Sequence, residues 1–566
     1  MRSKIHTGLS RRDGILILVG ASVVYLLNAF FSYSPSLPPQ ILLPTPHRQE
    51  LGFEVPLPPE PKIIEKVTPP PPPVPKALDL GLSKIPETTK VIHAPGWTLF
   101  QNLYMANGTL FVVTSDPSSF PERRKMISTG LTALNNPENI RLREPTDQEL
   151  QFISPEEASA RWGGNLELNE RHRIWSVEGI SMLVNEPVQF LDHYYHFVAE
   201  LMFGAWAFIY GTFNPHARIV DSTSSFGRAP TDPSLSSFMP PVPGNAYHPP
   251  ELSRLMFLHA TANQWKDKPG FNAYFMHAVF PSLNVETEED WIDRSNATFV
   301  NSTTLEHGIP QKAWHFPMAI LTDRSAAFRG EACGLRNQRI ASEPWEVLVE
   351  KGGIDPVGQW WGDVRHRLYR FAGIEKDHRI TTKFTYASQI TATDAQEVLP
   401  LPPDEVVITY INRQTVRRHL ITEHHEELVK SIQEMVDRNR AEGKNWVFKD
   451  VKPERLTKDE QVKLASETTI LLGVHGNGLS HLIWMQPNRY STVIEIFYPG
   501  GFAHDYEWTS RSLGMRHFSV WNDTSFTHPN EPEVGYPEGF QGTSIPVHGP
   551  TVAKLIEDRL EGRLHY

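Results

Sequence analysis

Apolar and polar residues follow a regular pattern between residues 405 and 497. Four short runs rich in Val, Ile and Leu, at 405–411, 446–448, 469–474 and 492–497, alternate with stretches whose apolar residues recur at helical spacing. The short runs predict buried strands, and the stretches between them predict amphipathic helices. Strands and helices that alternate with short connections are typical of a parallel, doubly wound sheet, so we predict an α/β fold for this region.

Local signals mark where these helices begin and end. Thr422 is expected to cap a helix that runs to about Arg440 and stops at Gly443. The sequence Thr457-Lys-Asp-Glu460 is a capping box, in which the Thr and Glu side chains bind backbone N–H groups at the start of a helix. We therefore assign 401–520 to a Rossmann-like, ligand-binding domain.

The preceding region, 90–400, is less regular. The stretch from His193 to Tyr210 is apolar nearly all round and predicts a buried helix. We expect a second α/β domain with insertions, including a Ser- and Pro-rich loop at 221–250. The final segment, 521–566, contains a helical stretch and is expected to return across the two domains. The strands expected in the first domain lie at 109–113, 180–184, 255–258 and 318–321.

Residues 14–31 form an 18-residue apolar run that Arg and Lys precede and that no basic residue follows until Arg48. This length is the low end of a membrane span, and the charge asymmetry places the N-terminus in the cytoplasm. A cleaved signal peptide is the rival interpretation, but Ser34-Pro35 offers no good cleavage site. We predict a cytoplasmic tail at 1–13, a transmembrane signal anchor at 14–31 and a Pro-rich, extended stem at 32–89.

Composition narrows the classes of function. The net charge is -11 and no basic stripe stands out, which argues against a nucleic-acid partner. The single cysteine, Cys333, excludes an intramolecular disulfide framework and a Cys-based zinc site. Four Asn-x-Ser/Thr sequons fall beyond the stem, in agreement with a lumenal location. The expected glycosylation sites are Asn107, Asn296, Asn301 and Asn522.

A glycine-rich turn follows the strand expected at 469–474. It reads His475-Gly476-Asn477-Gly478, and a segment with helical spacing comes next. Backbone N–H groups gather at such a turn, and the helix dipole adds partial positive charge, so the turn is suited to anions and above all to phosphates. Any strand-to-helix turn favours glycine, but the flanking His475 and Asn477 make the pattern more specific.

Glu495 lies among apolar residues in the strand expected at 492–497. A buried Glu is costly unless a partner satisfies it. The hydroxyl pair of a ribose beside a bound diphosphate would be such a partner; a neighbouring Arg or backbone group is the alternative. Together with the glycine turn, Glu495 predicts a nucleotide-sugar site.

Arg413 and Arg417 directly follow the strand expected at 405–411, near the carboxyl edge of the sheet where α/β proteins bind ligands. Arginine forks suit phosphate oxygens, although a solvated basic turn is the alternative. No Asp-x-Asp motif occurs beyond the stem. We therefore expect arginine and helix dipoles to neutralise a diphosphate, and we predict neither a metal nor another cofactor.

Asp192, His196 and Glu200 form the candidate catalytic group. Their spacing puts them on one helical face if the helix already begins at Asp192; otherwise Asp192 is its N-cap. A His that carboxylates hold in one tautomer can act as a general base. Two alternatives are a surface pair of His196 and Glu200 and a metal site that adds His193, although the spacing is not the His-Glu-x-x-His zinc pattern.

These motifs resemble a known family. The block Gly473–His481 with the following Val493–Ile496 resembles the signature of glycosyltransferase family 61, as do Ile408–Arg413 and His196–Glu200. The similarity covers about 170–520. It implies a GT-B fold, with two Rossmann-like domains facing a cleft, and inverting, metal-independent transfer from a UDP-sugar, commonly xylose or N-acetylglucosamine. Family members commonly have Ala where this chain has Asn477.

We therefore expect a type II membrane glycosyltransferase of the Golgi or endoplasmic reticulum that acts on a glycan or glycoprotein. In a GT-B enzyme the base should come from the acceptor-side, N-terminal domain, and His196 is our candidate, oriented by Asp192 or Glu200. A catalytically inactive, membrane-anchored carbohydrate-binding or scaffold protein of the same fold is the main alternative. A membrane metallohydrolase is a more distant one.

Overall fold

A computed structural model describes the chain over residues 84–164, 172–214, 249–299, 311–327, 339–350, 354, 358–374 and 399–564. All of these residues belong to one compact unit, Lys76–Tyr566. The predicted anchor, most of the stem and of the loop at 221–250, Asn301 and Cys333 lie outside the described residues. Among the helices that are described, none is both long and apolar enough to cross a membrane.

The first sheet has nine strands in the order β4-β3-β2-β9-β6-β7-β8, with β1 paired to β2 and β5 paired to β9. Strands β6, β7, β8 and β9 run parallel, whereas β2 runs antiparallel to β9, so the sheet is mixed. All four strands predicted for this region are present. The strands are β1 (Thr89–Ala94), β2 (Trp97–Ala106), β3 (Thr109–Val113), β4 (Leu150–Ile153), β5 (Ile174–Ser176), β6 (Ile180–Val184), β7 (Arg254–Phe257), β8 (Asn284–Glu286) and β9 (Ala313–Thr322).

Both faces of the first sheet are buried. Leu255 and Phe257 point into one core with the following helices, and Met256 between them points into another. The predicted helix at 193–210 forms as a π-helical segment, η3 (Tyr195–Met202), that continues into α6 (Phe203–Phe213). The other helical segments are η1 (Pro117–Ser119), α2 (Arg123–Met126), α3 (Pro137–Leu142), α4 (Pro155–Trp162), α5 (Val188–Leu191), α8 (Phe271–Val279), α9 (Glu288–Thr298), α11 (Arg324–Ala327), α13 (Arg339–Glu350), η5 (Gln359–Trp361) and α14 (Gly362–Phe371).

The second sheet has six strands in the order β11-β10-β12-β13-β14-β15. The first five are parallel, and β15 is antiparallel to β14. The predicted parallel, doubly wound sheet is therefore formed. Its strands are β10 (Val406–Ile411), β11 (Trp446–Val451), β12 (Thr468–Val474), β13 (Thr492–Ile496), β14 (Arg516–Trp521) and β15 (Thr524–Phe526).

Helices connect these strands largely as predicted. The capping box of Thr457 and Glu460 is present at the start of α17. Two predictions were wrong in detail: Thr422 is the first residue of α16 and does not cap it, and the segment after the glycine turn is a 3₁₀ helix. The helical segments are α16 (Thr422–Ala441), η6 (Pro453–Arg455), α17 (Lys458–Glu467), η7 (Asn477–Trp484), α18 (Asp505–Ser512) and α19 (Gly549–Leu560).

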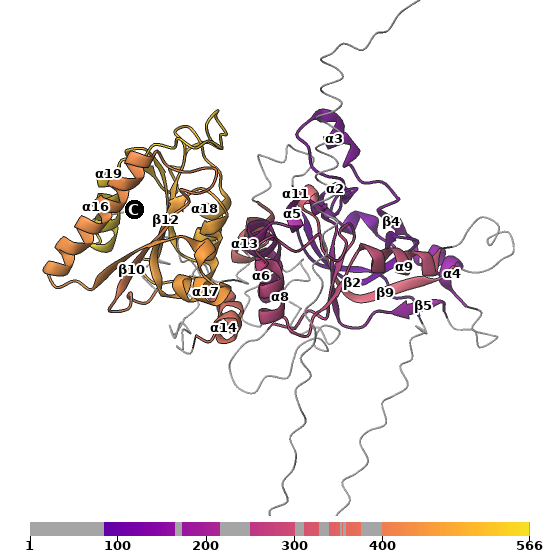
Figure 1. The fold of residues 1–566 in the computed structure, drawn as a ribbon. Coiled ribbons are helices and arrows are strands. Elements are labelled where there is room, and N and C mark those ends of the chain that lie inside the picture. Colours follow the sequence, from indigo (N-terminus) through magenta and orange to yellow (C-terminus); the bar gives the residue numbers. More distant parts are fainter. Residues whose placement is uncertain are drawn as a thin grey trace, which may run out of the picture. The chain divides into compact units, whose positions relative to one another are not determined.

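The last helix, α19, packs beside α16 (Figure 1). Asn439 of α16 donates a hydrogen bond to the Glu557 carboxylate at 2.7 Å, and a Cβ on Gly549 would lie 2.7 Å from the Glu427 carbonyl oxygen. Apolar residues of α19 join the core on one face of the second sheet. The return of segment 521–566 across both domains stays a prediction.

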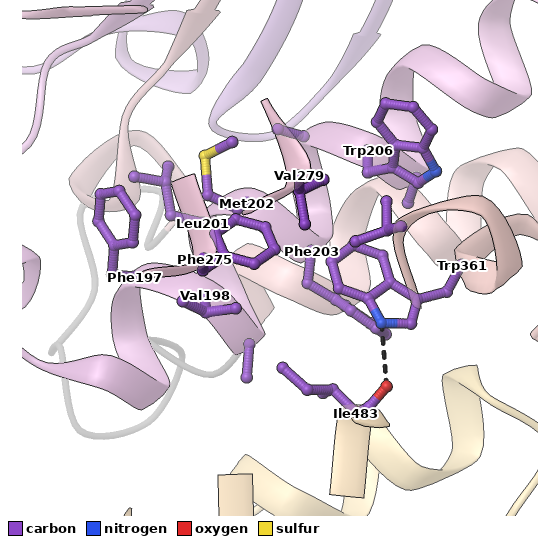
Figure 2. Packing of buried hydrophobic residues seen from close by; sticks show 14 of the residues in the cluster. Phe197, Val198, Leu201, Met202, Phe203, Trp206, Phe275, Val279, Trp361 and Ile483 are labelled. Carbon is purple, nitrogen blue, oxygen red and sulfur yellow. Dashed lines mark hydrogen bonds between the residues drawn. The ribbon is translucent and has the colours of Figure 1, made fainter. Parts of the chain in front are cut away.

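One hydrophobic core is shared by residues of both sheets. It includes Phe257 of the first sheet, Leu471 of the second, and most of η3 and α6 between them. Figure 2 shows the indole of Trp361 donating a hydrogen bond to the carbonyl of Ile483, at 3.0 Å, beside apolar residues of η3. The core therefore fixes the π-helical segment against the helix that follows the glycine turn.

Candidate active site

The second sheet has a switch point between β10 and β12. These strands are neighbours, but β10 leads to β11 on one side and β12 leads to β13 on the other. Ligands of open α/β sheets bind at the carboxyl ends of the strands at such a point. Arg413 follows β10 and His475 follows β12, so the topology brings the two predicted phosphate-binding segments together.

Arg413 and the glycine turn fit closely. The guanidinium donates to the His475 carbonyl at 2.8 Å and to the Arg417 carbonyl at 3.4 Å. Gly476 has φ of +147°, and a Cβ there would lie 1.6 Å from Nη1 of Arg413. A Cβ on Gly478 would lie 2.7 Å from the Ile411 side chain. A side chain at position 476 would displace the Arg413 guanidinium, and one at position 478 would force the Ile411 side chain to shift.

Arg418 also belongs to this site, and sequence reasoning chose its neighbour Arg417 instead. The Arg417 side chain is exposed, whereas Arg418 is partly buried, with its Nε enclosed and without a hydrogen-bond acceptor among the described residues. Arg418 adopts a left-handed conformation, with φ of 58°. Burial, with the charges of Arg418 and Arg417, lowers the pKa of Arg413 to about 10, and Tyr506 opposes the shift.

None of these three arginines has a carboxylate within 4.0 Å in the part of the chain that the structure describes. Buried cations usually have a partner, because desolvation of an unpaired charge is costly. Arg413 and Arg418, which are both partly buried beside the glycine turn, therefore have the chemistry of an anion site, and the binding of a diphosphate stays a prediction.

Glu495 has two histidine partners. Its Oε1 lies 2.5 Å from Nδ1 of His475, and its Oε2 lies 2.8 Å from Nε2 of His517. Burial raises the pKa of Glu495, and burial with the nearby charge of Arg418 lowers the pKa of His475. Glu495 therefore has partners within the protein, and they are histidines instead of the Arg or backbone group weighed as the alternative. Its contact with a ribose stays a prediction, because each carboxylate oxygen can accept a further hydrogen bond.

His196 and Glu200 form a second dyad of the same kind. Nδ1 of His196 lies 2.6 Å from the Glu200 carboxylate, and the His196 side chain is 20% exposed whereas that of Glu200 is fully buried. The pair is therefore not the surface pair weighed as an alternative. Asp192 is the exposed C-cap of α5, before the π-helical segment, so it neither shares a helical face with His196 nor caps that helix.

Arg324 joins this second dyad to Glu186. Its Nη1 donates to the Glu200 oxygen that contacts His196, and its Nε donates to Glu186 at 3.2 Å. Sequence reasoning missed both residues, although Glu186 and Arg324 each lie two residues beyond a parallel strand, β6 and β9. The rule used for Arg413, that functional side chains follow strand ends, would have found them.

The two dyads are linked through the glycine turn. The backbone N–H of Tyr195 donates to Oδ1 of Asn477 at 3.1 Å, and the Tyr195 hydroxyl donates to the Asp505 carbonyl at 2.6 Å. The residue after Asp505 is Tyr506, whose ring centroid lies 5.8 Å from that of His475 and 4.8 Å from that of Tyr195. Asn477 thus ties the turn to the residue that precedes His196.

Most of this site falls within one match to a known family, although Glu186 and Glu495 lie just outside it. The family model described as glycosyltransferase 61 matches residues 194–494, which is more than half of the chain. The chain belongs to glycosyltransferase family 61. A relative, the EGF domain-specific O-linked N-acetylglucosamine transferase of Drosophila melanogaster, is 30% identical over 138 residues. That alignment spans 24% of this chain and 24% of the relative.

A pocket of about 610 Å³ opens at the carboxyl ends of β10 and β11 in this family 61 protein. Asn412, next to Arg413, lines it and donates to the Asp450 carboxylate at 2.9 Å. Its volume lies in the range of small-ligand pockets. The other lining residues are Val451, Lys452, Arg455, Leu456, Glu460, Lys463, Leu464 and Glu467.

One group of side chains in the described part of the chain has the spacing of metal ligands: Glu507, His528 and Glu531 lie within 4.8 Å of one another. Glu507 is already held by His504 at 3.1 Å and by Arg511 at 2.9 Å, so its carboxylate has little left for a cation. The group does not include His193, His196 or Glu200, and a metal-free reaction of this family 61 protein stays a prediction.

The predicted glycosylation sites differ in how much of each asparagine is exposed to solvent. Asn107 and Asn296 are exposed, and Asn522 is partly exposed. Asn296 is in helix α9, and the Thr298 hydroxyl of its sequon accepts a hydrogen bond from the Asn107 backbone at 2.8 Å. Whether the sites are glycosylated stays a prediction.

Proposed function

We propose that this family 61 protein transfers a sugar from a UDP-sugar to a glycan or glycoprotein acceptor, with inversion and without a metal. The observation that carries the proposal is the pair of arginines, Arg413 and Arg418, without carboxylate partners among the described residues, beside the glycine turn and the oriented His475. A diphosphate has the charge and size that such a site would neutralise. The pocket next to Arg413 would take the nucleoside.

N-acetylglucosamine is the favoured donor sugar, ahead of xylose. The Drosophila relative is named as an N-acetylglucosamine transferase, although it aligns over only 24% of its length. The expected GT-B arrangement fits a site built from the strand ends of two sheets. A membrane anchor and residence in the Golgi or endoplasmic reticulum remain part of the proposal, on the strength of residues 14–31.

The proposed reaction is a single displacement. His196 takes the proton of the acceptor hydroxyl through Nε2, because Nδ1 is engaged by Glu200. The acceptor oxygen forms a bond to the anomeric carbon while the bond from that carbon to the β-phosphate oxygen breaks, and UDP leaves with the electron pair. Arg413 and Arg418 stabilise the charge that develops on the diphosphate. His475 would donate to the same group through its Nε2–H, with the proton shared with Glu495 held on that carboxyl, whose pKa burial raises.

A panel of UDP-sugars tests the proposal. The full-length protein is assayed for binding and for slow release of UDP, with and without EDTA. We expect UDP-N-acetylglucosamine to bind best and to release UDP equally in chelator. Binding without any UDP release, even with glycoprotein acceptors, would favour the inactive carbohydrate-binding alternative. Loss of release in EDTA and recovery in Mn²⁺ would overturn the metal-free mechanism.

A further inference from the structure

A buried chain of four side chains ends at His196. Nε of Arg324 donates to Glu186 at 3.2 Å, Nη1 of Arg324 donates to Oε2 of Glu200, and the same oxygen lies 2.6 Å from Nδ1 of His196. Nη2 of Arg324 also donates to the His196 backbone carbonyl, at 3.3 Å. One guanidinium therefore holds both the backbone of residue 196 and the partner of its ring.

This chain is costly to bury. The side chains of Glu186, Glu200 and Arg324 have no exposed surface. Taking each charge out of water costs several kcal/mol, and well-packed apolar residues often stabilise a core as well as a buried ion pair does. The chain is therefore poorly explained by stability alone. Of the four side chains, His196 has exposed surface, and its second ring nitrogen, Nε2, is left for the acceptor.

A histidine base must be neutral before it accepts a proton. A buried carboxylate alone would favour the imidazolium form, because the two would make an ion pair. Arg324 changes this balance, since it satisfies the same Glu200 oxygen with a permanent positive charge. We propose that Arg324, itself held by Glu186, is a positioning residue that keeps His196 neutral and oriented for proton transfer. The inference rests on the proposed function, in which His196 is the base.

Several charged or titratable groups face His196. Its ring lies 4.8 Å from that of His193 and 5.4 Å from that of Tyr195, measured between centroids. Burial is the largest cause that lowers the pKa of His196, to about 3, and the charge of Arg324 is the next; Asp505 and Asp192 oppose them. Loss of the Arg324 charge removes one of the causes that lower the pKa of His196, so that pKa should rise. The pKa of Glu200, which burial raises to about 7 and Arg324 lowers, should rise as well.

The test measures the protonation of His196 in the absence of a sugar donor. Diethyl pyrocarbonate modifies neutral imidazole, and mass spectrometry with peptide fragmentation separates His196 from His193 in the full-length protein. In the native protein, the rate at His196 should stay constant from about pH 5 to 7.5, because the ring is neutral throughout. In Arg324→Met the rate should fall at least about threefold toward the acidic end. Arg324→Lys keeps the charge and should stay flat.

Two further variants keep the test decisive. Arg365→Met removes a buried arginine of α14 that does not belong to the group of Glu186, Arg324, Glu200 and His196. This variant should leave the labelling rate of His196 independent of pH. If Arg324→Met does not fold, the double variant Arg324→Met/Glu186→Gln replaces it, since it also removes the carboxylate left unpaired. A flat profile in the folded Met variant overturns the role of Arg324, as does a titration that appears equally in Arg365→Met.

Turnover gives a second readout. Where the UDP-sugar panel yields product, Arg324→Met should lower kcat by at least about tenfold, most at low pH, and leave KM for the donor within about twofold. Arg324→Lys should recover most of kcat. The labelling result stands even where no donor is turned over, so failure of the proposed function and failure of this inference are distinguishable.

Discussion

The guanidinium of Arg413 occupies the space that a side chain on Gly476 would need. A Cβ on Gly476 would lie 1.6 Å from Nη1 and 2.7 Å from Cζ of Arg413. The glycine turn and the arginine that follows β10 therefore pack against each other, and a side chain at position 476 would displace the guanidinium.

Gly476→Ala should displace Arg413 and weaken UDP-sugar binding by at least about tenfold, or 1.4 kcal/mol. Calorimetric titration with UDP measures the loss. Gly443→Ala is a matched control, because Gly443 also has positive φ, +92°, but no atom within 4 Å of its Cβ position. Gly443→Ala should cost stability through backbone strain and leave UDP affinity unchanged. Equal UDP affinity in Gly476→Ala and the native protein would contradict the fit.

Arg418→Gly should separate binding from stability. Glycine adopts the left-handed conformation of this residue without strain, so the melting temperature should not fall. UDP affinity should fall roughly tenfold or more, because a charge-assisted contact to the diphosphate is lost. Arg417→Ala, at the exposed neighbour, should change UDP affinity much less. A larger loss in Arg417→Ala than in Arg418→Gly would show that the phosphate is bound from the outer side of the turn.

Asn477→Ala should be tolerated. The substitution removes the hydrogen bond from the Tyr195 backbone and costs about 1 kcal/mol, which thermal unfolding would detect as a small decrease in melting temperature. Turnover should stay within about threefold of the native value, because the partners of this side chain in the structure, the Tyr195 backbone and the Ser480 hydroxyl, belong to the protein. A loss of donor affinity without loss of stability would instead give Asn477 a direct role.

His481→Gln should make stability less sensitive to acid. Burial lowers the pKa of His481 to about 4 from its ordinary 6.5, so the unfolded chain takes up a proton there that the folded protein does not. Stability is therefore lost as pH falls below about 6.5, by up to 1.4 kcal/mol per pH unit for this one group. We expect the free energy of unfolding, measured with urea between about pH 4 and 7, to change less steeply with pH in the variant. The difference in slope should correspond to at most one proton. Identical slopes would mean that His481 has the same pKa in the folded and the unfolded protein.

Four strands of the second sheet could be predicted because their signals are local: each contains a short apolar run, and the capping box of Thr457 and Glu460 needs only four consecutive residues. β14 and β15 were not predicted, because their sequences mix polar and apolar residues. Glu495 lies in one of the four apolar runs and could be predicted to be buried for that reason. Its partners could not be predicted, since His517 lies 22 residues away on another strand and pairs with it only when β13 and β14 align.

The buried chain at His196 is the opposite case. Arg324 contacts Glu186 across 138 residues and Glu200 across 124, so no local pattern contains the group. The i, i+4 spacing of His196 and Glu200 correctly suggested a pair, but it could not say which side faces the interior. The pairing of β6 with β9 places Glu186 and Arg324 beside each other, and Arg324 contacts the buried Glu200.

The shared core has a consequence for how the protein melts. Trp361 and Ile483 are hydrogen-bonded across it, and Trp484 donates to the Tyr194 hydroxyl at 2.7 Å. Separating the two sheets would bring these aromatic side chains into water while each sheet was still intact, and such a half-open state has little to stabilise it. Calorimetry should therefore record a single cooperative transition for the two sheets, with indole fluorescence changing at the same temperature as the circular dichroism.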